Sequence, residues 1–246
     1  MPITLSNCCN PTTRRSFLKA AGIATAAGLL TAGPFAQLAY AAALTKAQRE
    51  KLTPDEIIAM MKRGNERFRS GKGSKQDFLA QQKASAKGQY PAAVILSCID
   101  SRASAETIMD LGIGDVFNAR VAGNIANDDI LGSMEFACAA AGAKVVLVMG
   151  HTACGAIKGA IDDVKLGNLT GLLARIQPAV KETSYPGDRS TKNNAYVDAV
   201  ARRNVELTME SIRKGSPVLS ELKAKGAINI FGAMYDIASG KVDFFS

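Results

Sequence analysis

Short apolar runs alternate with longer segments of helical periodicity along most of this chain. The runs at 92–97 and 144–149 are apolar at nearly every position, which is typical of strands buried on both faces of a sheet. Segment 54–69 spaces its apolar residues as a helix does and carries acidic residues in its first turn. Strands that alternate with helices predict a mainly parallel sheet covered on both faces, so we expect an α/β fold. No internal repeat or linker interrupts the pattern, and a single domain is therefore expected.

The rest of the chain continues the same alternation. A weaker strand is predicted at 115–119, and two final strands at 227–235 and 241–245 around a turn at Ser239-Gly240. Further helices are predicted at 104–111, 130–141, 155–164, 169–182, 194–214 and 217–224, and segment 72–88 is expected to be a loop or a short helix.

Residues capable of catalysis follow the two strongest strands directly. The strand at 92–97 runs into Cys98-Ile99-Asp100-Ser101-Arg102, and the strand at 144–149 runs into Gly150-His151-Thr152-Ala153-Cys154. Ligands of parallel sheets bind beyond the carboxyl ends of the strands. If the two strands are neighbours, these side chains converge on one point.

Two thiolates and one imidazole form a donor set that zinc prefers. Cys98, His151 and Cys154 supply three ligands, which leaves the fourth tetrahedral position open, as in catalytic rather than structural zinc sites. His151 is the only histidine in the chain, so any further ligand must be a thiolate or a carboxylate. The alternatives are a hydrogen-bonded core histidine and a Cys98–Cys154 disulfide. Cys138 lies in an alanine-rich helical segment and is expected to be a small buried apolar residue.

The first 41 residues have the composition of an export signal. Residues 13–19 (TRRSFLK) precede an alanine- and glycine-rich apolar run of about 17 residues, and Ala39-Tyr40-Ala41 is a small-x-small cleavage pattern. The consecutive arginines followed by Ser, Phe, Leu and Lys resemble the twin-arginine signal, which implies export to the periplasm of a bacterium by the twin-arginine machinery. The alternatives are a buried helix or a membrane anchor, but the run is shorter than the roughly 20 residues that span a bilayer. Residues 42–246 are then the mature domain, with no membrane span.

Of the formal net charge of +8, residues 1–41 carry +3 from Arg14, Arg15 and Lys19, and the basic residues of the remainder are scattered. Neither a basic stripe nor a known reader motif is present, so no nucleic-acid partner is expected.

The strand-end motifs resemble those of the β-class carbonic anhydrases. That family has Cys-x-Asp-x-Arg, here at 98–102, followed about fifty residues later by His-x-x-Cys, here at 151–154. The resemblance begins at Gly64-Asn65, includes ARVAGN at 119–124 and reaches GAMYDIASGKVDF at 232–244. It therefore covers essentially the whole mature chain.

The resemblance implies zinc on Cys98, His151 and Cys154 and the reversible hydration of carbon dioxide to bicarbonate and a proton. It also implies a mostly parallel five-stranded sheet and a homodimer or a dimer of dimers. Two alternatives stay open: a carbon disulfide or carbonyl sulfide hydrolase of the same fold, and a non-catalytic protein that binds zinc or bicarbonate.

The same resemblance implies roles for five residues around the metal. Asp100, held by Arg102, orients water at the metal; released from Arg102, Asp100 becomes the fourth zinc ligand and closes the site. We expect the open state at neutral and alkaline pH. Gln89 and Phe117 match substrate-pocket positions, and Gly155 offers a backbone N–H. Because the chain has no second histidine, the proton must leave through buffer, water chains or Asp100.

Overall fold

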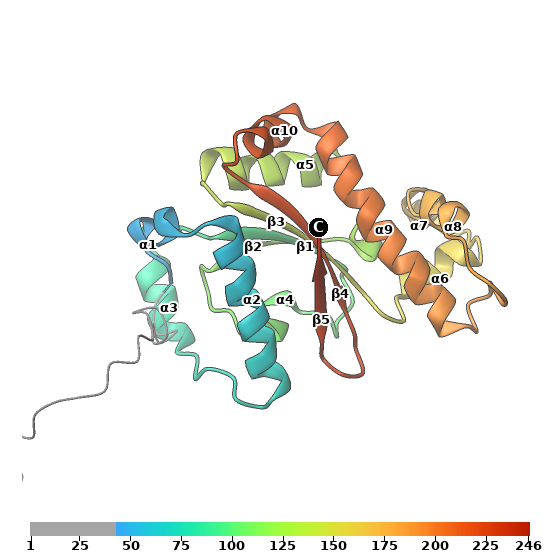
Figure 1. Cartoon of the computed structure of the whole chain (residues 1–246), viewed down its shortest axis with the longest axis horizontal. Helices are drawn as coiled ribbons and strands as arrows, with labels where there is room; N and C mark the ends of the chain where they lie inside the picture. The colour runs from blue at the N-terminus through green and yellow to red at the C-terminus, as the bar shows by residue number, and fades with distance from the viewer. Residues whose placement is uncertain (1–42) are drawn as a thin grey trace, which may run out of the picture. The chain divides into compact units, whose positions relative to one another are not determined.

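The structure, a computed structural model, describes residues 43–246; the predicted signal at 1–41 lies outside the described residues. Its centre is a five-stranded sheet in the order β2-β1-β3-β4-β5 (Figure 1). The first four strands of this order run parallel, and β5 pairs antiparallel with β4. The predicted α/β fold with a mostly parallel sheet is confirmed. The strands are β1 (Ala93–Ser97), β2 (Val116–Arg120), β3 (Val145–His151), β4 (Asn229–Tyr235) and β5 (Val242–Phe245).

Strand β3 is buried at every position, and its side chains alternate between two apolar layers. Val145, Leu147 and Met149 pack in the layer formed with α2 and α4, whereas Val146 and Val148 pack with the helices of the opposite face. This two-sided burial explains the unbroken apolar run in the sequence. The helices of the two layers are α2 (Pro54–Arg69) and α4 (Ala105–Ile108) on one face, and α5 (Asp128–Glu135), α9 (Asn194–Gly215) and α10 (Pro217–Ala224) on the other.

Strands β1 and β3 are neighbours, with Ser97 opposite Met149. The chain leaves β1 toward β2 on one side of it, and β3 lies on the other side, so the strand order reverses at the β1–β3 pair. In parallel sheets such a switch point opens a crevice beyond the strand ends. The fold therefore brings the two predicted strand-end motifs together.

Helix boundaries differ from the prediction where local signals were overlooked. Helix α1 (Lys46–Lys51) was not predicted, although Thr45 and Gln48 form a capping box that marks its start. The predicted helix at 169–182 is two helices, α7 (Gly167–Ala174) and α8 (Gln177–Glu182). Pro178 explains this correction, because proline starts a helix well but cannot continue one.

The predicted helices 54–69 and 217–224 have the same bounds as α2 and α10, and 194–214 differs from α9 by one residue. The remaining helices are correct in place but differ in extent. Helix α4 is shorter than 104–111, and α6 (Gly155–Ile161) ends before 164. The helix predicted at 130–141 begins at Asp128 as α5 and closes in one π-helical turn, η2 (Phe136–Ala140). The segment 72–88 contains the short helix α3 (Phe78–Ser85).

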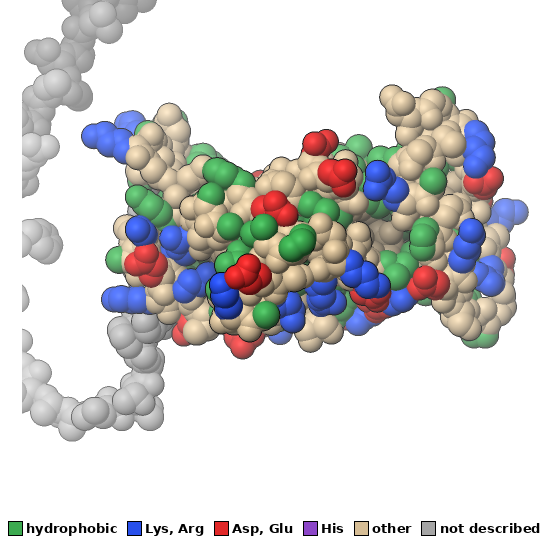
Figure 2. All heavy atoms as spheres, turned by 90° about the horizontal axis from the view of Figure 1, so that it is seen from above, with side chains coloured by type: hydrophobic (Ala, Val, Ile, Leu, Met, Phe, Trp, Pro, Cys, Tyr) green, Lys and Arg blue, Asp and Glu red, His purple; other side chains and the backbone are tan. Residues whose placement is uncertain are grey.

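Two global features agree with the composition. None of the helices within residues 43–246 is long and apolar enough to cross a membrane. On the face drawn in Figure 2, basic side chains are interspersed with acidic and apolar ones rather than gathered into one stripe.

Cys138 is buried among apolar residues of the α5–α10 face, as predicted, and burial raises the pKa of its thiol to about 12.

Candidate metal centre

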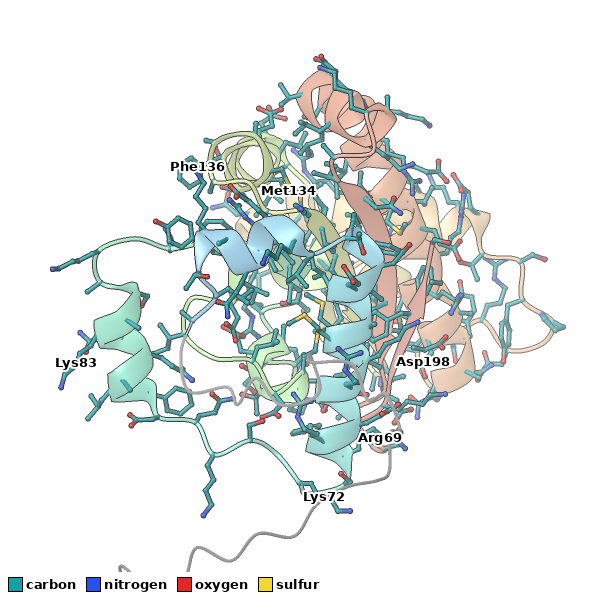
Figure 3. The ribbon with its side chains drawn as sticks, turned by 60° about the vertical axis from the view of Figure 1, so that its left-hand side comes forward. Arg69, Lys72, Lys83, Met134, Phe136 and Asp198 are labelled. Atoms are coloured by element: carbon teal, nitrogen blue, oxygen red, sulfur yellow. The ribbon has the colours of Figure 1, made fainter. Side chains whose placement is uncertain are left out.

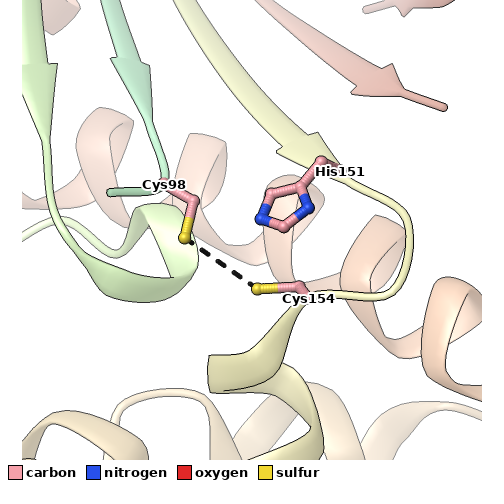
Figure 4. A group of neighbouring side chains, drawn as sticks. All are labelled: Cys98, His151 and Cys154. Atoms are coloured by element: carbon pink, nitrogen blue, oxygen red, sulfur yellow. Dashed lines mark hydrogen bonds between the residues drawn. The ribbon is translucent and has the colours of Figure 1, made fainter. Parts of the chain in front are cut away.

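The structure brings Cys98, His151 and Cys154 into one buried group (Figure 4). Cys98 follows the last residue of β1, His151 ends β3, and Cys154 is the N-cap of α6. Their ligand atoms all lie within 4.8 Å of one another. The pairing of the neighbouring parallel strands β1 and β3 thus brings together Cys98 and His151, which lie more than fifty residues apart in the sequence.

The two cysteines are free thiols, and their sulfurs lie 4.0 Å apart, about twice the length of a disulfide bond. The hydrogen bond between the two sulfurs lowers the pKa of the Cys98 thiol. The pKa of Cys154 is raised by the same hydrogen bond, by burial and by the charge of the Cys98 thiolate, so the two sulfurs resist being thiolates together. A divalent cation removes this conflict, since it binds both sulfurs as thiolates.

His151 offers one nitrogen to this group. Its Nδ1 lies 2.9 Å from the carbonyl oxygen of Thr152, and because a carbonyl only accepts, Nδ1 carries the proton. Its Nε2 is buried and has no hydrogen-bond partner among residues 43–246. An unpartnered imidazole nitrogen beside two thiols is the donor set of a three-ligand zinc site, so the residues fit the predicted metal.

Asp100 lies beside this group and is held by Arg102. The Nε and Nη2 of Arg102 donate to the two carboxylate oxygens at 2.9 and 2.8 Å, and the Arg102 backbone N–H donates at 2.9 Å. These bonds hold the pKa of the Asp100 carboxyl well below its usual range. One carboxylate oxygen is 3.9 Å from Nε2 of His151, so Asp100 borders the ligands without being one of the clustered group.

The loop after β1 is fixed from β2 by Arg120, a residue for which the sequence pattern predicted no role. Its Nε donates to the Cys98 carbonyl at 3.0 Å and its Nη2 to the Asp100 carbonyl at 2.6 Å. The backbone N–H of Gly123 points at the Cys98 sulfur, at 3.4 Å. The ARVAGN segment therefore lies against the metal group, which its motif match alone did not reveal.

The predicted substrate-pocket residues are divided between the two ends of the sheet. Gly155 adjoins Cys154, and a Cβ there would meet no described residue within 4 Å, so it borders open space. Gln89 is exposed and precedes β1, whereas Cys98 follows it. Phe117 pairs with Val94 near the start of β1 and packs edge-on against Phe136. Gln89 and Phe117 thus lie near the start of β1, at the opposite end of this strand from the metal group of the same chain. Their role in a substrate pocket stays a prediction.

Comparison with known proteins bears on the same residues. The profile of the carbonic anhydrase family matches residues 93–242, a stretch that contains every metal-group residue. The chain belongs to the carbonic anhydrase family. Carbonic anhydrase 2 of Mycobacterium tuberculosis is 34% identical over 187 residues, which cover 74% of this chain and 87% of that protein. The carbonic anhydrase of Mycolicibacterium smegmatis is 30% identical over 192 residues, covering 76% and 90%.

Solved structures place the chain with the β class. The β-carbonic anhydrase CafA of Aspergillus fumigatus superposes with a TM-score of 0.58 at 28% identity, covering 67% of this chain and 79% of that one. A structure reported among two tetrameric β-carbonic anhydrases of Sordaria macrospora gives 0.57 at 26% identity, covering 65% and 82%. The β-class family suggested by the sequence motifs is therefore confirmed.

Proposed function

We propose that this protein catalyses the reversible hydration of carbon dioxide to bicarbonate and a proton. The observation that carries the proposal is the buried Cys98–His151–Cys154 group, with an Arg102-held carboxylate at its edge. Cys98, His151 and Cys154 would hold zinc, which would act there as a Lewis acid and lower the pKa of water, as in carbonic anhydrases with three histidine ligands. The family match supplies the reaction that this chemistry serves.

The chain's own residues orient the reactants and move the proton. Asp100 stays ionised because Arg102 lowers its pKa, so its carboxylate is available to accept a hydrogen bond and orient water. His151 serves as no proton shuttle, because Nδ1 is committed to Thr152 and Nε2 faces the metal group. With no other histidine in the chain, the proton leaves through buffer, water chains or Asp100.

A stopped-flow assay of the zinc-loaded protein tests this function. We expect carbon dioxide hydration, and loss of both zinc and activity in Cys98→Ser and His151→Ala. The matched control is Cys138→Ser, because Cys138 is a buried thiol outside the metal group. Turnover of carbon disulfide or carbonyl sulfide without carbon dioxide hydration would establish the hydrolase alternative, and zinc binding without any turnover would establish a binding protein.

We also propose a homodimer, or a dimer of dimers, built on the free edge of β2. In the part of the chain that the structure describes, strand β2 ends the sheet, and three large apolar residues nearby are exposed: Phe78, Ile113 and Phe136. A cavity of about 630 Å³ lined partly by Phe68, Phe78 and Val116 opens along the same edge. An unpaired strand edge with apolar surroundings favours pairing with a second copy. The Sordaria relatives are described as tetrameric, which supports an oligomer here.

Residues 1–41 are proposed to direct the chain through the twin-arginine route to the periplasm. The support is the order of the arginine pair, the apolar run and the small-x-small pattern. Export of a folded protein suits a site whose thiolates are shielded once zinc is bound. Arg14→Lys with Arg15→Lys should leave the protein in the cytoplasm, whereas Lys19→Arg should be exported normally. Normal export of the double variant would overturn the proposal.

A further inference from the structure

One peptide group joins the histidine of the metal group to a carboxylate on another helix. The carbonyl oxygen of Thr152 accepts the proton on His151 Nδ1 at 2.9 Å. The amide on the other side of the same peptide bond belongs to Ala153, and its N–H donates to Oδ1 of Asp198 at 2.9 Å. Asp198 stands in the first turns of α9 (labelled in Figure 3). A continuous chain of two hydrogen bonds therefore runs from the Asp198 carboxylate to the imidazole.

The segment that contains the Thr152–Ala153 peptide is held from several sides, so the chain of hydrogen bonds follows from the fold. The N–H of Thr152 donates to the Tyr235 carbonyl at 2.9 Å, and its hydroxyl accepts from the N–H of Ile237 at 3.0 Å. Ala153 has φ of 53°, in the left-handed region that non-glycine residues seldom adopt. The bond from its N–H to Asp198 stabilises this turn between His151 and Cys154.

We propose that Asp198 is the outer carboxylate of the His151 ligand and acts on it through the Thr152–Ala153 peptide. A carboxylate that accepts from a peptide N–H polarises that peptide and makes its carbonyl a stronger acceptor, because hydrogen bonds in a chain reinforce one another. A stronger acceptor on Nδ1 makes the imidazole a better electron donor at Nε2. Metal-binding histidines commonly donate directly to a carboxylate for this purpose. Here one peptide group stands between the two, and Asp198 is a positioning residue rather than a metal ligand.

The single histidine makes the relay directly measurable by NMR. In zinc-loaded protein labelled with 15N-histidine, one imidazole gives all the ring signals, since His151 is the only histidine. Asp198→Asn keeps an oxygen that can accept from Ala153 but removes the charge. We expect the Nδ1 proton to move upfield in Asp198→Asn and further in Asp198→Ala, because its hydrogen bond weakens. The control Glu206→Gln removes a carboxylate from the same helix, where it pairs with Arg202 and Arg203, and should leave the signal in place.

Zinc affinity gives a second readout. Chelator competition should show roughly 10-fold weaker zinc binding in Asp198→Asn and no change in Glu206→Gln, since outer-shell partners typically contribute 10- to 100-fold. An unchanged Nδ1 proton and unchanged affinity in Asp198→Asn would overturn the proposal.

A double variant separates this role from simple support of the turn. Glycine adopts positive φ without strain, so Ala153→Gly should restore the turn when Asp198 is replaced. We expect Asp198→Asn with Ala153→Gly to recover thermal stability while the Nδ1 signal and the zinc affinity stay altered. Recovery of all three would show that Asp198 only supports the turn, and the relay would be wrong.

The inference rests on the proposed zinc site but is tested without turnover. Wild-type protein that binds zinc and hydrates no carbon dioxide would refute the proposed function and leave these measurements valid.

Discussion

At the level of single residues, the state of the metal centre depends on whether the Asp100 carboxylate pairs with Arg102 or binds zinc. Its carboxylate oxygens receive three N–H bonds from Arg102, two from the guanidinium and one from the backbone. A paired guanidinium and carboxylate has two parallel bonds and a fixed plane, so the carboxylate is well ordered. Because Arg102 keeps Asp100 ionised as well as oriented, the same pair is expected at neutral and alkaline pH.

Replacing Arg102 tests this competition. In Arg102→Ala, Asp100 has no guanidinium partner and should move onto zinc as the fourth ligand. Zinc content should stay at one per chain while turnover falls on the order of 10²-fold, a loss typical of a positioned proton-accepting group. An X-ray absorption spectrum at pH 8 reports the ligands. Arg102→Lys keeps the charge but not the two parallel hydrogen bonds, so its turnover should lie between those of the wild type and Arg102→Ala. A carboxylate already on zinc in the wild type would contradict the open resting state.

At the level of elements, Asn65 ties together segments that are distant in sequence. This buried side chain of α2 donates to the carbonyls of Ile108 at 3.1 Å and Gly240 at 2.8 Å, and accepts from the N–H of Val242 at 3.0 Å. It therefore joins α2 to the end of α4 and to the β4–β5 hairpin. Gly64 beside it has no room for a side chain, because a Cβ there would collide with the Met109 carbonyl.

Loss of these bonds should destabilise the domain. Asn65→Ala removes three hydrogen bonds and leaves buried backbone groups unpaired, so the free energy of unfolding should fall by about 2–4 kcal/mol. Denaturant unfolding of the zinc-loaded protein measures it, with Asn168→Ala at an exposed position of α7 as the control. A loss no larger than the control's would show that solvent replaces these bonds readily.

Asp115, just before β2, should make stability depend on pH. Burial raises the pKa of its carboxyl to about 6, although the N–H of Gly112 donates to it at 2.7 Å. The folded state therefore holds this proton more tightly than the unfolded state, whose carboxyl has a pKa of about 3.9. Stability is then lost as pH rises from about 4 to about 6, by on the order of 2–3 kcal/mol.

Asp115→Asn removes this dependence, since an amide can accept from Gly112 without ionising. Its unfolding free energy should match the wild type at pH 4 and exceed it at pH 7.5. An equal difference in unfolding free energy between Asp115→Asn and the wild type at both pH values would show that the Asp115 carboxyl has an ordinary pKa.

The parts of this fold that the sequence predicted are those with a local cause. Two-sided burial makes 92–97 and 144–149 apolar throughout, and strand ends carrying Cys98, His151 and Cys154 converge in any parallel sheet that pairs these strands. The roles of Asp198 and Asn65 depend on contacts 45 and up to 177 residues away, which no periodicity encodes. The break between α7 and α8 had a local signal in Pro178 that helical spacing outweighed.

At the level of the whole molecule, the pocket predicted around the metal requires residues that a single chain keeps apart. Gln89 precedes β1 and Cys98 follows it, and the five residues of β1 alone extend about 16 Å. Phe117 lies beside Phe136, whose side chain points outward while Met134 of the same helical segment points into the core (Figure 3). If Gln89 and Phe117 form the pocket, we expect them to do so in the site of a second copy, across the proposed interface at the β2 edge.

Mixed dimers decide between the two arrangements. His151→Ala chains have no metal site but an intact Gln89, and Gln89→Ala chains have an intact metal site but an incomplete pocket. If the pocket is shared, a mixed dimer has one complete site, and equal co-expression should restore about a quarter of wild-type activity through random pairing in a twofold dimer. If each chain builds its own pocket, the mixture should show only the average of the two variants. Phe136→Glu, which places a charge on the apolar edge, should lower the dimer fraction in sedimentation and abolish the recovery. Full activity of Gln89→Ala alone would instead remove Gln89 from the pocket.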